Sequence, residues 1–256
     1  MVARWCGGLG TVDEDALEFR ICRRVPAVRQ RRIQRSQLSL WSSRARNVRY
    51  REWHHLASLR AMPGMIVIRP ADANEVAEAW QLILHIKDRP VSLVLTRQAL
   101  PTLDRRKYAP TARVAKGAYI LLDASDSKPD VLLMATGSEV SLRVDAHGQL
   151  ASEGIQARVI SIPSWELFES QSLEYRNSVL PPEVVARVAV EEASTFGWER
   201  YTGPRGAIIG IHSFGLSAPI EVIQRHFGFT PEHVVSAPRQ QVAPRRIGND
   251  QAKTSI

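Results

Sequence analysis

The sequence is poor in cysteine and has no long apolar run. Its two cysteines, Cys6 and Cys22, both lie near the amino terminus of the 256-residue chain, so we expect neither a disulfide framework nor a thiolate metal site in the body. No apolar run approaches the roughly 18–20 residues that span a bilayer. The first twenty residues include four acids where a secretory signal would be apolar, which predicts no export signal. Together these absences favour a reducing, cytoplasmic setting.

Lysine is absent from the first fifth of the chain, although the chain as a whole carries a net charge of +8. Residues 1–52 hold 12 arginines and 5 acids, a net charge of +7, which leaves +1 for residues 53–256. The body is therefore nearly neutral and has no basic stripe that would suit a nucleic acid.

Residues 1–53 form an Arg-rich segment, here called the arm. It has little helical or strand periodicity, and its second half consists of serines, arginines and isolated apolar residues. Such a segment buries too little apolar surface to offset the entropy lost on ordering. We therefore expect the arm to be disordered.

After the arm the sequence takes on the alternation of an α/β protein. Residues 65–69 and 91–95 are short apolar runs, rich in β-branched residues, that suit buried strands. Between them, residues 73–86 predict a helix, with Asp72 as its cap and Glu75 at capping-box spacing. Strand, helix and strand joined by short turns predict a parallel βαβ unit.

A second α/β unit follows a polar linker at residues 101–117. Its expected strands cover residues 118–122, 131–135, 157–162, 186–190 and 207–211. Its expected helices cover residues 138–153, 165–168 and 218–227. Five strands with interspersed helices predict a domain of its own. The boundaries that we expect are 54–110 for the first unit, 111–240 for the second and 241–256 for a tail.

The segment Ala135-Thr-Gly-Ser-Glu-Val140 joins an expected strand to an expected helix. Free amides at a helix start can hold an anion, and Ser138 can cap the helix. On the residues alone, a tight turn with an ordinary cap is the favoured interpretation. No second glycine pattern and no Lys-Ser or Lys-Thr pair accompanies it, which excludes a dinucleotide fingerprint and a Walker loop.

Other polar residues form no catalytic constellation. Glu191 and Glu192 are neighbours at the end of an expected strand, so their side chains point to opposite faces and make a poor acid–base pair. We expect one buried or interface acid and one solvated acid. The seven histidines are scattered without metal-ligand spacing, and Ser213 and Ser217 near His212 lack a nucleophile elbow. The sequence therefore predicts no catalytic residue and no metal ligand.

Arg97 lies just past the end of the strand expected at residues 91–95. Ligands of open α/β sheets gather at this edge, and a planar guanidinium matches phosphate oxygens. On spacing alone, a surface arginine in a loop is the favoured interpretation.

Several segments resemble the transketolase family, in the family's order. They are residues 55–75 (HLASLRAMPGMIVIRPADANE), 90–101 (PVSLVLTRQALP), 116–119 (KGAY), 135–140 (ATGSEV), 196–201 (FGWERY), 213–219 (SFGLSAP) and 226–230 (HFGFT). The resemblance runs from about His55 to Val235.

The resemblance implies a remnant of the family's parallel-sheet pyrimidine-binding domain, followed by its five-stranded C-terminal α/β domain. The family transfers a two-carbon ketol unit between sugar phosphates, with thiamine diphosphate held by a divalent metal such as Mg²⁺. Arg97 matches the family's arginine that grips the substrate phosphate, so it is the one substrate-binding residue that carries over. The family's C-terminal domain contributes to dimer packing, so a homodimer or another transketolase subunit is the implied partner.

Most of the family's active site has no counterpart in this sequence. The family's histidine motifs before the match are replaced by residues 46–54 (RNVRYREWH), and there is no metal-binding Gly-Asp-Gly motif. We therefore expect the chain to be inactive alone and to bind neither thiamine diphosphate nor Mg²⁺. A frameshift upstream of a transketolase coding region would produce such an Arg-rich junction, and an unrelated extension is the alternative.

Three functions stay open at this point. The first is a transketolase by descent whose catalysis is lost. The second is a C-terminal binding or dimerisation subunit of a split transketolase, although a true split half would retain the whole middle domain. The third is a nucleic-acid binder that uses the basic arm, which the neutral body disfavours.

Overall fold

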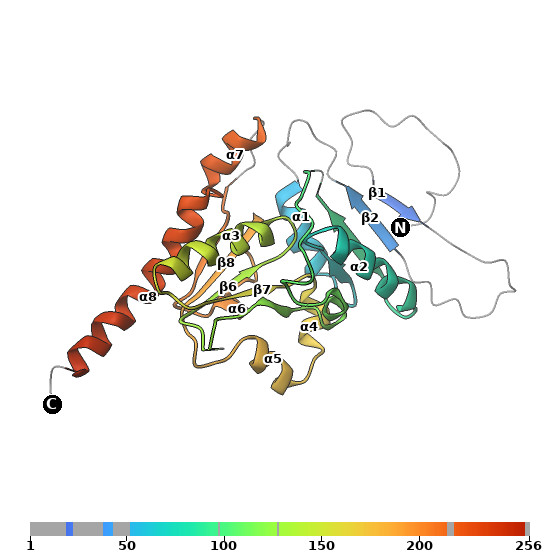
Figure 1. The fold of residues 1–256 in the computed structure, drawn as a ribbon. Helices are drawn as coiled ribbons and strands as arrows, with labels where there is room; N and C mark the ends of the chain where they lie inside the picture. Colours follow the sequence, from blue (N-terminus) through green and yellow to red (C-terminus); the bar gives the residue numbers. More distant parts are fainter. Residues whose placement is uncertain are drawn as a thin grey trace, which may run out of the picture.

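The computed structural model describes residues 19–22, 38–42, 52–96, 98–126, 128–213 and 218–253. These residues form a four-stranded sheet and a five-stranded sheet, with helices packed on both (Figure 1). The predicted α/β class is confirmed, with a small, mainly parallel sheet before a five-stranded one. None of the helices in this part of the chain combines the length and apolar character that a bilayer crossing requires.

The small sheet is built around β3 (Ile66–Ile68) and β4 (Val91–Leu95), which run parallel. Helix α2 (Ala73–His85) connects them, as the βαβ pattern predicts. Asp72 caps this helix, because its carboxylate accepts a hydrogen bond from the Glu75 backbone N–H at 2.8 Å. The predicted strand, cap and helix are confirmed within one residue or two at their ends.

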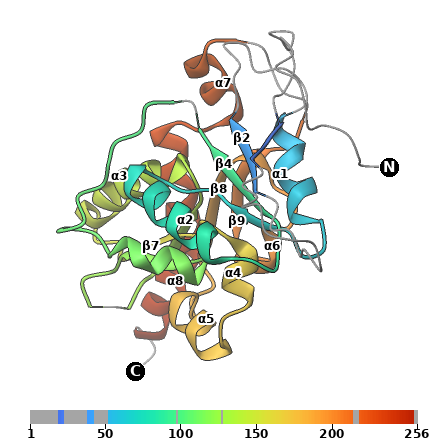
Figure 2. The same ribbon diagram turned by 90° about the vertical axis from the view of Figure 1, so that its right-hand side faces the viewer.

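Both faces of the small sheet are covered, as parallel strands require. Ile66 and Ile68 pack with the apolar side of α2 on one face. Val67 points to the other face and packs with Leu56 of α1 (Glu52–Arg60). Figure 2 shows α1 and α2 on opposite sides of β4. The β3 residues thus alternate between two small cores, which fixes the orientation of the strand.

Two strands of the arm extend the small sheet, β1 (Phe19–Cys22) and β2 (Leu38–Ser42). Strand β2 pairs with β4 in the parallel direction, and β1 pairs with β2 in the antiparallel direction. The structure differs here from the expectation that residues 1–53 lack regular structure, and residues 1–18, 23–37 and 43–51 lie outside the described residues. The physical reason is the free edge of β4, whose unpaired backbone groups can accept a further strand.

The large sheet has the strand order β5-β7-β6-β8-β9. Its parallel strands lie where the sequence predicts them: β6 (Val131–Ala135), β7 (Ala157–Ser161), β8 (Arg187–Ser194) and β9 (Ala207–Ile211). Strand β5 (Tyr119–Leu122) pairs with β7 in the antiparallel direction and forms one edge. Strand β8 continues beyond the expected end at residue 190, so that it includes both Glu191 and Glu192.

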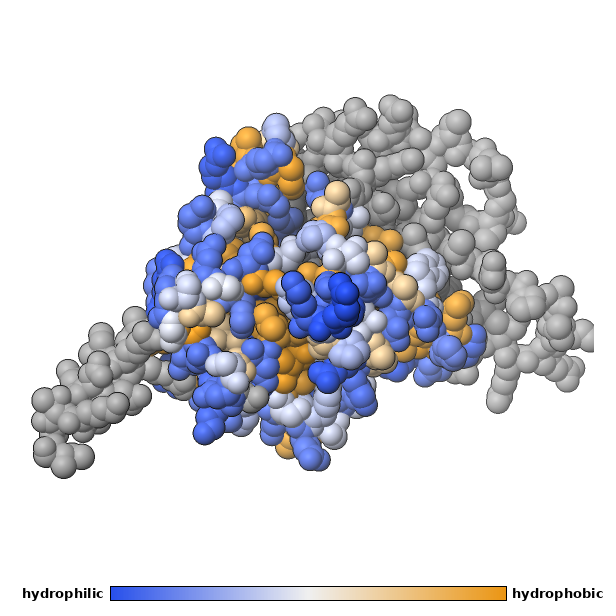
Figure 3. All heavy atoms as spheres, in the orientation of Figure 1, coloured by the Kyte–Doolittle hydropathy of each residue, from blue (hydrophilic) through white to orange (hydrophobic). Residues whose placement is uncertain are grey.

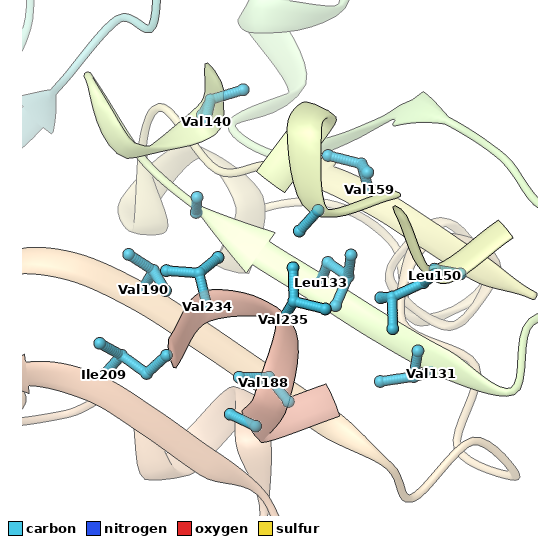
Figure 4. Packing of buried hydrophobic residues seen from close by; sticks show 14 of the residues in the cluster. Val131, Leu133, Val140, Leu150, Val159, Val188, Val190, Ile209, Val234 and Val235 are labelled. Atoms are coloured by element: carbon cyan, nitrogen blue, oxygen red, sulfur yellow. The ribbon is translucent and has the colours of Figure 1, made fainter. Parts of the chain in front are cut away.

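Helices α3 (Glu139–Ser152) and α8 (Pro231–Lys253) cover one face of the large sheet. Figure 4 shows Val235 of α8 beside Leu133 of β6, and Val234 of α8 beside Val190 of β8. All four side chains are at most 1% exposed. This apolar contact holds α8 against the sheet.

The opposite face of the large sheet is covered by α4 (Trp165–Glu169), α5 (Leu173–Val179) and α6 (Glu199–Thr202). Trp165 and Trp198 meet edge to face, with ring centroids 5.1 Å apart. Aromatic pairs favour this geometry because the positive ring edge meets the negative ring face. The large sheet is therefore the middle layer of an α/β/α sandwich.

The sequence pattern does not predict α5, α6, α8 or the 3₁₀ helix η1 (Thr111–Lys116), which lies within the expected linker. The expected helices near residues 138, 165 and 218 are confirmed, the last as α7 (Ile220–Phe227). Helix α8 also runs through position 240, where we expected the second domain to end. It was missed because Pro238 interrupts its helical pattern, whereas burial of its apolar side chains against α3 and the sheet stabilises it.

Exposed apolar side chains are scattered over the described surface. The large ones are Met62, Leu84, Leu173, Phe196 and Val222, which belong to different elements or loops. Figure 3 shows one face of the molecule, on which hydrophilic side chains surround several hydrophobic patches. Single exposed apolar residues are normal on a folded chain, so these carry no functional conclusion.

Arg143 on α3 is buried without an acidic partner. Its side chain is fully inaccessible, and its guanidinium donates one hydrogen bond, from Nη1 to the Val234 carbonyl oxygen at 3.2 Å. Its Nε and Nη2 have no hydrogen-bond partner among the described residues. Burial lowers the pKa of this guanidinium to about 9, which reflects the cost of holding a charge there.

We expect Arg143→Met to stabilise the fold. The substitution keeps an unbranched side chain of similar length and removes a buried charge that lacks a counter-ion, so the gain should be about 1–3 kcal/mol in the free energy of unfolding. Urea titration measures it. The control is Arg158→Met, which should destabilise, because Arg158 pairs with Asp123 at 2.7 Å and 3.1 Å. A loss of stability in Arg143→Met would show that the guanidinium has a partner we do not identify.

Candidate functional site

The candidate site lies at the carboxyl ends of β6 and β8, which are neighbours in the large sheet. The chain leaves β6 through α3 toward β7, on one side, and leaves β8 through α6 toward β9, on the other. In open α/β sheets this reversal of strand order leaves a crevice in which ligands bind. We call this place the switch crevice. Its described walls are the β6–α3 turn and the last residues of β8.

The side chain of Arg69, which follows β3 of the small sheet, fills the switch crevice. Its Nη1 donates to the Thr136 carbonyl oxygen at 3.0 Å, and its own carbonyl oxygen accepts from the Gly137 N–H at 3.1 Å. Gly137 has a φ of +60°. A Cβ built there would lie 2.8 Å from Cζ of Arg69. The turn therefore needs glycine both for its backbone conformation and to leave room for the guanidinium.

Two buried carboxylates neutralise Arg69. Both of its terminal nitrogens bind Glu139, with Nη2 3.0 Å from Oε1, and Nη1 lies 3.7 Å from Oε1 of Glu191. The side chains of both acids are fully buried, and that of Arg69 is 12% exposed. Burial alone would lower the pKa of the guanidinium, but Glu139 and Glu191 outweigh it and raise the pKa above its ordinary value. Arg69 is therefore charged at neutral pH.

Glu191 also binds Arg60, from α1. Helices α1 and α2 with strands β3 and β4 are here called the small unit, and the large sheet with its helices is called the large unit. The two guanidinium nitrogens of Arg60 lie 2.8 Å from the two carboxylate oxygens, which is the bidentate geometry. Trp198 donates its indole N–H to the same carboxylate at 2.7 Å, and Arg60 stacks over Trp165 at 3.7 Å from the ring centroid. Burial would raise the pKa of Glu191, but these donors and Arg69 hold it below its ordinary value.

Glu192 points to the other face of β8 and has a different environment. Its Oε1 accepts a hydrogen bond from the Gln224 side chain of α7 at 2.8 Å. Burial and the nearby charge of Glu139 raise the pKa of Glu192 to about 7, against smaller opposing effects of Gln224 and Arg69. The second acid is therefore partly buried and bound to the protein, which corrects the expectation that it is solvated.

A second polar contact joins the small unit to the end of β7. The fully buried carboxylate of Glu75 accepts hydrogen bonds from Tyr119 Oη at 2.6 Å, Ser161 Oγ at 2.9 Å and the Ala71 N–H at 2.8 Å. Burial raises the pKa of Glu75, while these donors oppose the shift. Glu75 is thus more than the capping-box residue that the spacing predicts, because it also ties α2 to the large sheet.

The edge of β3 is closed by the large unit. The Val67 N–H donates to the carboxylate of Glu166 at 3.1 Å, and the Arg69 N–H donates to the Pro163 carbonyl oxygen at 2.8 Å. These acceptors take the place of a further strand. The ends of β6, β7 and β8 and the edge of β3 therefore form one continuous polar junction.

The structure describes some of the residues that the sequence singles out and leaves Arg97 untested. Arg97 lies outside the described residues, so its expected role stays a prediction. The tight turn at Gly137 is confirmed, but Ser138 makes no cap hydrogen bond and instead donates to Glu139 at 2.6 Å. The group held at this turn is a cation, the opposite of the anion that a helix start can bind. Glu191 is the buried acid that the pattern predicts.

The sequence reasoning missed the residues that form the junction, Arg60, Arg69 and Glu139. Arg69 and Glu191 carry a weak signal, because each is a charged residue at the end of an apolar strand and so lies where strands meet. Arg60 gives none, since it looks like any basic residue in the last turn of a helix.

We expect Arg69→Met to be severely destabilising. It removes the guanidinium that neutralises the buried carboxylates of Glu139 and Glu191. Removing one partner of a buried ion pair costs about 3–5 kcal/mol. The loss should appear in urea or thermal unfolding. The control is Arg106→Met, whose pair with Asp104 is exposed and should barely matter. Equal stability of the two variants would mean that Arg69 contributes no more than a surface charge.

We expect stability to fall as the pH rises from about 4.5 to about 7, because Glu192 has a higher pKa folded than unfolded and so binds its proton more tightly in the folded state. Glu192 is partly buried, so the loss should be roughly 1–3 kcal/mol. The free energy of unfolding of Glu192→Gln, measured as a function of pH, checks this. Its slope against pH over this range should be smaller than that of the wild type. Glu75→Gln serves as a comparison, since the pKa of Glu75 is also raised. An unchanged slope in Glu192→Gln would contradict the assignment.

Two family models match the chain. The model described as the transketolase pyrimidine-binding domain matches residues 52–102, which include α1, β3, α2 and β4. The model described as the transketolase-like C-terminal domain matches residues 117–230, which include the whole large sheet. The polar junction thus lies between two domains of one family.

Transketolases are also the similar sequences. The transketolase of Geobacillus stearothermophilus is 54% identical over 181 residues, which are 71% of this chain and 27% of that protein. Transketolase 7 of Craterostigma plantagineum is 48% identical over 189 residues, or 73% of this chain and 28% of that protein. The chain therefore spans about a quarter of the length of the curated relatives it matches. These relatives lend no support to a nucleic-acid-binding function.

Solved transketolases share the fold. The enzyme from Leishmania mexicana superposes with a TM-score of 0.69 and 39% identity, over 75% of this chain and 27% of that one. A split-gene transketolase, described as an inactive β4 tetramer, superposes with a TM-score of 0.61 and 23% identity, over 75% of this chain and 62% of that one, which shows the fold alone. The sequence and structural matches together show that this chain belongs to the transketolase family, with the end of the pyrimidine-binding domain and the C-terminal domain in residues 52–230.

Proposed function

We propose that this chain is a non-catalytic member of the transketolase family, in which the C-terminal domain serves as a docking platform for the end of the pyrimidine-binding domain. One observation carries the proposal. The carboxyl ends of β6, β7 and β8, where an open α/β sheet would bind a ligand, are occupied by Arg69, Glu75 and Arg60 of the small unit. The junction holds two domains together through these contacts.

The proposal includes a loss of the family reaction. In the intact family, thiamine diphosphate supplies the carbanion chemistry, and the protein positions it and the sugar phosphates. The described residues do not fit this cofactor. No group of three or more His, Cys, Asp or Glu side chains within them could hold a metal ion. Their buried carboxylates Glu75, Glu139 and Glu191 each bind groups of this same chain.

Arg97 is the one substrate residue in the proposal. It follows β4, and the resemblance implies that it grips the substrate phosphate. A single guanidinium gives a weak phosphate contact that salt screens. We therefore propose that phosphate affinity is feeble and depends on Arg97.

A second candidate function is that of a subunit in a split transketolase. The observation in its favour is the likeness to the split-gene protein, of which this chain covers 62%. The chain would then be cytoplasmic and would pair with a second copy or with a chain that carries the rest of the active site.

We further propose that the C-terminal domain folds independently. Its expected limits of 111–240 are extended here to residue 253, because α8 is one continuous helix.

The purified chain should show no measurable ketol transfer and no saturable thiamine diphosphate binding, with or without Mg²⁺. Several converging groups are needed to position a cofactor and two sugar phosphates, and the buried carboxylates of Glu75, Glu139 and Glu191 are already bound within the chain. A coupled transferase assay and isothermal titration calorimetry measure the two properties. The chain must be prepared from a host without its own transketolase. Turnover that co-purifies with the folded chain would overturn the proposal.

The two candidate functions separate in a mixing experiment. If the chain is a split subunit, then adding a transketolase polypeptide that ends before the pyrimidine-binding match should restore turnover. If it is non-catalytic, then mixing should give none. The comparison variant is Arg97→Ala, which should abolish restored turnover and should weaken phosphate binding by the chain alone.

A further inference from the structure

The switch crevice is acidic on its own. Glu139 at the start of α3 and Glu191 and Glu192 on β8 all come from the C-terminal domain. The Arg69 cation comes from the other domain, 70 residues before Glu139 in the chain. Without Arg69, the crevice would hold these acids around the Gly137 turn.

The crevice matches a planar guanidinium better than a compact ammonium. Glu139 binds two nitrogens of Arg69 side by side, and the Thr136 carbonyl oxygen accepts a third hydrogen bond. The Gly137 backbone lies against the guanidinium, at a distance that no Cβ would allow. A fork of donors, a flat surface and buried carboxylates are the features that distinguish arginine recognition from lysine recognition.

We propose that the switch crevice of the C-terminal domain is a guanidinium-binding site whose resident ligand is Arg69. Docking of the small unit is then a binding reaction, in which the arginine after β3 enters the acidic crevice. The site takes guanidinium compounds, including free guanidinium ion, when the Arg69 side chain is removed. The proposal deepens the docking role proposed above, but its test does not depend on catalysis.

Chemical rescue of Arg69→Ala in the full chain tests the proposal. Guanidinium chloride at about 10 mM, far below the molar range in which it unfolds proteins, should raise the Tm of the variant by roughly 2–4 °C. Sodium chloride and ammonium chloride at the same concentration should not do so. The wild type should show no such rise, because its crevice is filled. An equal response to guanidinium and ammonium, or no response to guanidinium, would overturn the proposal.

Two further variants identify the binding groups. The double variant Arg69→Ala/Glu139→Gln lacks the Glu139 carboxylate that would bind the guanidinium ion. Its guanidinium-dependent rise in Tm should therefore be smaller or absent. Arg69→Lys keeps the charge but not the fork, and its Tm should fall below that of the wild type. This second variant keeps the proposal testable if Arg69→Ala does not fold. A lysine variant as stable as the wild type would show that the crevice recognises charge alone. Failed rescue would leave the expected absence of ketol transfer unaffected, so the two proposals fail separately.

Discussion

The arrangement of the two domains depends on the buried ion pairs of Arg69 with Glu139 and Glu191. Moving these charges out of water is expensive, and the cost is recovered only when each charge meets its partner in good geometry. The fork of Arg69 on Glu139, the bidentate pair of Arg60 with Glu191 and the indole N–H of Trp198 meet that condition. Any displacement of the small unit would leave buried charges unpaired. The pairs therefore favour one position of β3 against the large sheet.

The rest of the small unit follows from this constraint. Strand β3 has only three residues and α1 has nine, so neither would be stable alone. Their apolar side chains find partners partly in the C-terminal domain, since Leu167 belongs to the small core around β3 and Ala193 to the core around α1. The small unit is thus folded on the large one, and the sheet edge at which open α/β folds bind ligands becomes an internal interface.

The sequence predicts the regular core well and the junction poorly. Strands such as Val131–Ala135 and Val91–Leu95 have the predicted bounds, because a run buried on both faces must be apolar along its whole length. Helices α5 and α6 are too short for periodicity to show, and the prolines of α8 hide a helix that tertiary packing stabilises. Strand β2 depends on the free edge of β4, which no local pattern in the arm could indicate.

The junction was missed for a different reason. Arg60 and Glu191 are 131 residues apart, and local spacing carries no information on such a pair. Glu139 belongs to a turn motif for which the residues alone favour a tight turn with an ordinary cap, and an anion site is the alternative. The cation that occupies the turn comes from another domain. Family resemblance identified both domains but not what joins them.

The claim that one interaction fixes the two domains is tested most directly by a double-mutant cycle on Arg69 and Glu139. Unfolding free energies of the wild type, Arg69→Met, Glu139→Gln and the double variant give the coupling between the two side chains. The account predicts a coupling of about 2 kcal/mol or more, with the double variant more stable than the sum of the single losses implies. Additive losses would contradict it, because they would show that the two charges contribute to stability independently.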